Sequence, residues 1–133
     1  MAAVERLVTV VDVADEVADD RHVSVDARHE AVLTDGRRLL LLDDRGWGET
    51  RSWATVSAQE VEETTRVVVG PDEPPEGRTR EEMEADHWNY LARILRGYGV
   101  TVDAQELRQL RHDVVFSERL LTRIGQDPGA AAR

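Results

Sequence analysis

Glu84 and His87 come closest to a known chemistry by type and spacing, because Glu-x-x-His places both side chains on one face of a helix. Carboxylate-bridged di-iron bundles hold metal with this spacing, but they need a second copy on a facing helix. The sequence has no second copy, since Arg108 and Gln109 precede His112. His87 also falls on an apolar helical stripe, where a hydrogen-bonded core histidine is the usual occupant. We therefore expect no metal site and no cofactor.

His29 is a second candidate, because its place in an alternating stretch puts it among the inward-facing residues. It could act as a base with Asp113 or Glu30, but nothing in the sequence brings a nucleophile to it. Ser57 and Ser117 are better explained as helix caps than as nucleophiles. The glycine patterns of serine hydrolases, phosphate loops and dinucleotide-binding folds are absent. No catalytic residue is therefore assigned, and whether the protein is an enzyme stays open, with a non-enzyme favoured.

Residues 44–55 are predicted to form the longest loop that also carries large aromatic side chains and arginines. Such residues are enriched in binding hot spots, so Arg45, Trp47 and Arg51 are the candidate partner-binding residues. An alternative is that Trp47 and Trp53 fold back and plug the ends of the core. Trp47 lies between two glycines and is expected to be the more exposed tryptophan, with Trp53 anchoring the loop.

A β-hairpin over residues 22–43 is the element that organises these candidates. Residues 22–33 alternate between apolar and polar, which is typical of a strand with one buried face. Asp35-Gly36 is a strong hairpin-turn signal, because glycine and short polar residues accept positive φ cheaply. The returning strand carries four consecutive leucines at 39–42, so two of them must point away from that buried face. We expect the following helices to cover these two.

The first twenty residues are open to two interpretations. The β-branched run at 8–13 favours a strand near residues 6–13, whereas Val4, Leu7, Val8 and Val11 also fit helical spacing. The acidic segment that follows, within 12–20, lacks the alternating carboxylates and central glycine of a calcium loop. We expect it to be a solvated, partly helical connection.

Four helices are predicted after the hairpin, with N-caps at Ser57, Thr79, Asp103 and Ser117. The helix after Thr79 should run to Gly97–Gly99 and be the principal helix packed on the hairpin. Strands that precede helices along the chain indicate an α+β fold. The prediction is an N-terminal antiparallel sheet of about three strands covered by C-terminal helices. Residues 1–125 should form one domain, and 126–133 a flexible C-terminal tail.

The composition limits the chemistry of the protein and the cellular compartment in which we expect it. The 133 residues include no cysteine, which excludes disulfides and thiolate chemistry. No apolar run approaches the roughly 20 residues of a membrane span. The N-terminus also lacks the basic-then-apolar order of a secretory signal. We expect a soluble, cytoplasmic protein that binds no membrane. All 17 basic residues are arginine, which together with abundant Ala, Val, Asp and Gly suggests a GC-rich bacterial genome.

The net charge of −10 bears most directly on partners. An acidic surface repels phosphate backbones, so nucleic-acid binding is disfavoured, and encounter with a basic protein is favoured. The charge could also serve solubility alone. The leading hypothesis is a non-enzymatic acidic protein that binds a basic protein partner, as small inhibitors and immunity proteins do. One alternative is a small-molecule binder or enzyme with a site between the sheet and the 44–55 loop, using Trp47, Trp53 and His29. Another is a homodimeric structural subunit whose mate covers exposed leucines.

Overall fold

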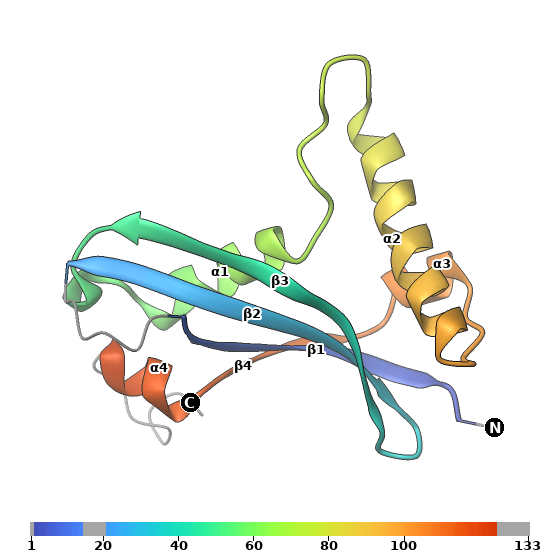
Figure 1. Cartoon of the computed structure of the whole chain (residues 1–133), viewed down its shortest axis with the longest axis horizontal. Helices are drawn as coiled ribbons and strands as arrows, with labels where there is room; N and C mark the ends of the chain where they lie inside the picture. The colour runs from blue at the N-terminus through green and yellow to red at the C-terminus, as the bar shows by residue number, and fades with distance from the viewer. Residues whose placement is uncertain (1, 15–20, 125–133) are drawn as a thin grey trace.

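The computed structural model describes residues 2–14 and 21–124. Its centre is a four-stranded mixed sheet of β1 (Val4–Val13), β2 (His22–Leu33), β3 (Arg38–Thr50) and β4 (His112–Phe116), in the order β3-β2-β1-β4 (Figure 1). β1 pairs antiparallel with β2, and β2 with β3, whereas β4 pairs parallel with β1. The predicted α+β class is confirmed. The acidic connection within 15–20 and the tail at 126–133 lie outside the described residues.

The helices begin at the four predicted caps. They are α1 (Ala58–Val68), α2 (Arg80–Gly97), α3 (Ala104–Arg108) and α4 (Glu118–Arg123), and a short 3-10 turn, η1 (Trp53–Thr55), precedes them. The side chains of Ser57, Thr79, Asp103 and Ser117 each accept a hydrogen bond from a first-turn backbone N–H. Thr79 and Glu82 form a complete capping box. Local capping chemistry therefore sets where each helix starts.

β4 was not predicted, and it raises the number of strands in the sheet from about three to four. Its sequence, His112–Phe116, contains the apolar run Val114-Val115-Phe116, which suits a strand. The chain reaches it only after α1, α2 and α3, and it then lies along β1 at the edge away from β3 (Figure 1). β1 itself is a strand throughout, so the strand interpretation of residues 6–13 is confirmed and the helical alternative is wrong.

Residues 44–50 belong to β3, so the predicted 44–55 loop is wrong over this part. β2 extends back to His22 and supplies hydrogen-bonding partners as far as Thr50. Gly46 serves this pairing, because a Cβ at this position would lie 2.6 Å from the carbonyl oxygen of Val25. The glycine therefore marks a close approach of two strands.

The hairpin turn has the predicted glycine at positive φ. Gly36 has a φ of +91°, and its N–H donates to the carbonyl of Leu33. The N–H of Leu33 donates in turn to the carbonyl of Arg37. The loop between these partners is three residues long, a form in which a residue with positive φ follows a tight turn.

The leucine run is buried more completely than strict alternation allows. Irregular pairing of β3 with β2 occurs on both sides of His29, where β3 contributes extra residues. Leu41 and Leu42 are both buried, and Leu39 packs against the same cluster. Leu40 alone lies on the opposite face, half-buried, so the expectation of two outward leucines is wrong.

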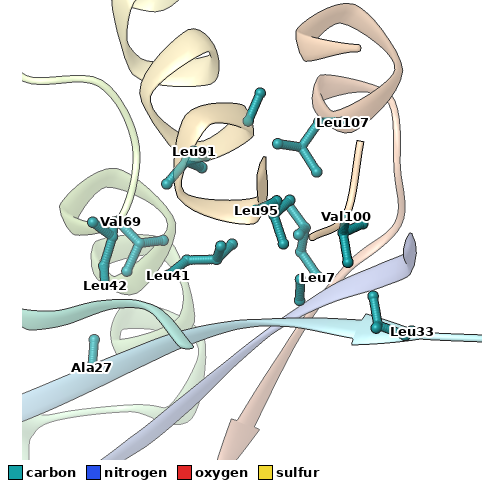
Figure 2. Close-up of a cluster of buried hydrophobic side chains, with 12 residues drawn as sticks. Leu7, Ala27, Leu33, Leu41, Leu42, Val69, Leu91, Leu95, Val100 and Leu107 are labelled. Carbon is teal, nitrogen blue, oxygen red and sulfur yellow. The ribbon is translucent and has the colours of Figure 1, made fainter. Parts of the chain in front are cut away.

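Two apolar clusters pack on one face of the sheet. The first joins the hairpin end of the sheet to α2 and α3, with Leu7, Leu41, Leu91 and Leu107 among its members (Figure 2). The second joins the other end of the strands to η1, α1 and α4 around Trp53. Thr9 and His29 lie on the same face of the strands, between the two clusters. Among the described residues, no helix combines the length and apolar character required to cross a membrane.

Candidate functional site

Thr9, His29 and His112 form a hydrogen-bonded trio on the covered face of the sheet. Thr9 pairs directly with His29 across β1 and β2, and His112 begins β4 beside Leu7. Oγ1 of Thr9 lies 2.7 Å from Nδ1 of His29 and 2.7 Å from Nε2 of His112. With its one proton the hydroxyl donates to one imidazole and accepts an N–H from the other. The two rings then carry their proton on the same ring nitrogen, both on Nε2 or both on Nδ1.

Both imidazoles of the trio are neutral at pH 7. Burial is the largest cause that lowers the pKa of His29 to about 3, and the nearby His112 and His87 act in the same direction. Burial also lowers the pKa of His112 to about 4, with the guanidinium of Arg66 adding to the effect. The neutral rings act as hydrogen-bonding groups and carry no charge.

A cavity of 270 Å³ opens above these two rings, and we call it the histidine cavity. Its walls come from the end of α1, the segment that follows it, α2 and α3. The lining residues are His29, Arg66, Val69, Gly70, Pro71, Glu84, His87, Trp88, Arg108 and His112. Arg66 donates to the carbonyl of His112 at 3.1 Å and pairs with Glu62 at 3.0 Å. Arg108 pairs with Glu84 at 2.7 Å.

His87 is half-buried and does not occupy the core position expected for it. Its ring packs edge-on against Trp88, with 5.1 Å between ring centroids, and no hydrogen bond joins it to the described residues. Burial lowers the pKa of His87. Glu84 of the same motif forms an ion pair with Arg108. Within the described ranges, no three His, Asp or Glu side chains converge in a way that could hold a metal ion.

The partners suggested for His29 do not reach it. Asp113 pairs with Arg6 at 3.2 Å and with Arg111 at 2.7 Å, on the face of the sheet opposite His29. Glu30 also lies on that opposite face, where Arg28 and Arg38 hold it. The actual partners, Thr9 and His112, were missed. The alternation along β1 could have pointed to Thr9 as a partner of His29, because it places Thr9 on the inward face together with Leu7 and Val11.

An acidic groove lies on the other side of His87, along β3 and α2. One part is a cavity of 290 Å³ that includes Met83, Tyr90 and His87 in its lining. The other is a shallower depression of 370 Å³ that reaches Trp47. Both parts contain Asp44 and Arg45. The aspartates that line the groove are Asp26, Asp43, Asp44, Asp72 and Asp86.

Arg45 and Trp47 lie in this groove, whereas Arg51 does not. Arg45 pairs with Asp72 at 3.2 Å and Asp44 at 3.6 Å. Arg51 is held at the end of β3 by ion pairs with Glu49 and Glu60.

The two tryptophans of this region differ in exposure as expected. Trp53 is 3% exposed, while Trp47 is half-buried and packs partly against the second cluster. Trp53 is therefore a core residue, as both sequence interpretations of the region expected. The exposed part of Trp47 lines the groove.

No known protein family matches the chain, and neither a curated protein nor a solved structure shows detectable similarity to it.

Proposed function

We propose that the protein is a non-enzymatic interaction protein whose acidic groove binds a basic segment of a protein partner. One observation carries the proposal: five aspartates line the groove and its only lining arginine within the described residues is Arg45. The groove is therefore a concave surface with an excess of carboxylates, and Trp47 and Tyr90 also line it. Opposite charges across an interface steer encounter and fix the register of the partner.

The groove offers an arginine or lysine side chain both charge and an apolar contact. Asp26 and Asp43 form no ion pair with any residue that the structure describes, so their carboxylates can accept hydrogen bonds from a partner. Tyr90 is 49% exposed and lies beside Met83, which suits it to contact the stem or the face of a guanidinium. Charge-assisted hydrogen bonds of this kind are stronger than neutral ones.

Titration with a synthetic arginine-rich peptide tests this proposal. Asp26→Asn combined with Asp43→Asn should weaken binding about fivefold or more, because exposed charge pairs contribute up to roughly 1 kcal/mol each. Glu5→Gln combined with Glu106→Gln removes the same charge outside the groove and is the matched control. Equal loss in both double variants would mean that only net charge matters, and the proposal would fail.

The same proposal assigns a cytoplasmic location, on the grounds of composition. For the homodimer alternative, three of the four leucines at 39–42 pack in the core, and Leu40 is half-buried. For the alternative of a small-molecule site beside the 44–55 segment, residues 44–50 of that segment are a strand.

A further inference from the structure

One ring nitrogen of His29 has no hydrogen-bond partner among the described residues and is open to the histidine cavity. His29 is 1% exposed, and its Nδ1 is used by Thr9. No group among the described residues hydrogen-bonds to its Nε2. Every fully enclosed polar side-chain atom of those residues has a partner, so Nε2 must reach the space of the cavity. This nitrogen can therefore hydrogen-bond to a molecule that occupies the cavity.

His112 adds the complementary group. Its Nε2 is used by Thr9, and its Nδ1 makes no hydrogen bond within the described residues. Because Thr9 gives its proton to one ring and accepts from the other, the two outer nitrogens are always one donor and one acceptor. The pair is therefore matched to a ligand that carries both an acceptor oxygen and a hydroxyl or a similar donor.

The charge of the lining selects an anion. Two guanidiniums, of Arg66 and Arg108, and one carboxylate, of Glu84, line the cavity, and Glu62 pairs with Arg66 beside it. Each guanidinium has five N–H donors, and its ion pairs use only some of them. The remaining donors can bind a planar carboxylate, for which the guanidinium fork is well shaped.

The apolar part of the lining selects an organic ligand of modest size. Val69, Pro71 and Trp88 form this part of the wall. The volume of 270 Å³ lies just below the range for small-molecule sites, which begins at roughly 300 Å³, so the ligand must be small. A bare inorganic anion would leave these apolar surfaces without a partner.

We propose that the histidine cavity binds a small organic acid. Its carboxylate lies against Arg66 and Arg108, its apolar body lies against Trp88, and its remaining polar atom meets His29 and His112. The site is distinct from the acidic groove, although His87 lines both. This proposal does not depend on the binding of a basic partner.

The test uses nuclear magnetic resonance of the histidine side chains with four probes at millimolar concentration: benzoate, 2-hydroxybenzoate, benzamide and inorganic phosphate. Both carboxylates should shift the ring signals of His29 and His112, and 2-hydroxybenzoate should bind more tightly because it adds a hydroxyl. Benzamide has the same body without the charge and should leave the signals in place. Unmoved signals with both carboxylates, equal shifts with benzamide, or binding of phosphate alone would each overturn the proposal.

Two variants test whether binding of the carboxylate requires a guanidinium of the histidine cavity. Arg108→Gln should weaken carboxylate binding about tenfold, as expected for loss of a charge-assisted hydrogen bond. Arg93→Gln removes the same charge from an exposed position of α2 and should leave the affinity unchanged. Arg66→Gln serves as a second variant of the cavity if Arg108→Gln does not fold. Equal effects of the cavity variant and of Arg93→Gln would place the binding elsewhere.

Discussion

Thr9 is the residue that holds the candidate site together. Its hydroxyl lies 2.7 Å from a nitrogen of each of two imidazoles and is itself fully buried. A valine at this position keeps the shape but leaves both nitrogens without their partner. Leaving a buried polar group unsatisfied costs more than the net value of the hydrogen bond that is lost.

We therefore expect Thr9→Val to lower the free energy of unfolding by about 1–3 kcal/mol. Thr65→Val is the matched control, because Thr65 is equally buried and bonds only to the carbonyl of Val61 within α1. Its loss leaves that carbonyl with its helical partner, so the effect should be smaller. Urea unfolding of both variants measures the difference, and equal effects would mean that the trio contributes nothing beyond packing.

The histidines also predict how stability depends on pH. The pKa of His29 is about 3 in the folded protein and about 6.5 in the unfolded chain, so between these values the unfolded state binds more protons. The free energy of unfolding therefore falls as the pH falls below about 6.5, by roughly 2 kcal/mol at pH 5 from His29 alone. The lowered pKa of His112, about 4, acts in the same direction.

Urea midpoints between pH 7 and pH 5 check this dependence. The carboxylates with lowered pKa values, Asp12, Asp35, Glu82 and Asp113, lose their contribution only at lower pH, near and below about 4. The window above pH 5 therefore isolates the histidines. A flat profile from pH 7 to pH 5 would contradict the assignment of neutral, buried imidazoles.

At the scale of elements, short sequence patterns predicted the features that depend only on neighbouring residues. The caps at Ser57, Thr79, Asp103 and Ser117 and the turn at Gly36 each depend on a few neighbouring residues, and each is present. β4 and the far half of β3 depend on partners distant in the sequence. The same limit applies to the site, because the contacts of Thr9 span 20 and 103 residues. Parity placed His29 inward, but no local pattern identifies its neighbours.

The tryptophans test the extension of β3. Trp53 is buried in η1, so Trp53→Ala should destabilise the protein by about 3 kcal/mol through the cavity that it leaves. Trp47→Ala should cost less, because Trp47 is only half-buried and is held in β3 by its backbone pairing with Val25. Thermal melts compare the two variants. A larger effect at Trp47 would reverse the assignment of Trp53 as the core residue.

At the scale of the whole molecule, one face of the sheet carries both core clusters and the histidine cavity, whereas the acidic groove runs along β3 and includes Asp26, which has the strand parity of the opposite face. The acidic groove and the histidine cavity lie on either side of His87, where α2 meets the sheet. The groove has an excess of carboxylates, whereas the cavity has two neutral imidazoles and two guanidiniums in its lining. Two surfaces with different charged groups thus share α2.

The central claim is that the negative charge serves recognition at the groove, and amide chemical-shift mapping with the arginine-rich peptide tests it most directly. The account predicts shifts confined to Asp26, residues 43–48, Asp72 and the part of α2 from Met83 to Tyr90, with saturation as peptide is added. Exposed acidic residues outside the groove, such as Glu5 and Glu118, should keep their positions. Weak shifts spread evenly over all acidic surfaces, without saturation, would show that the charge maintains solubility alone.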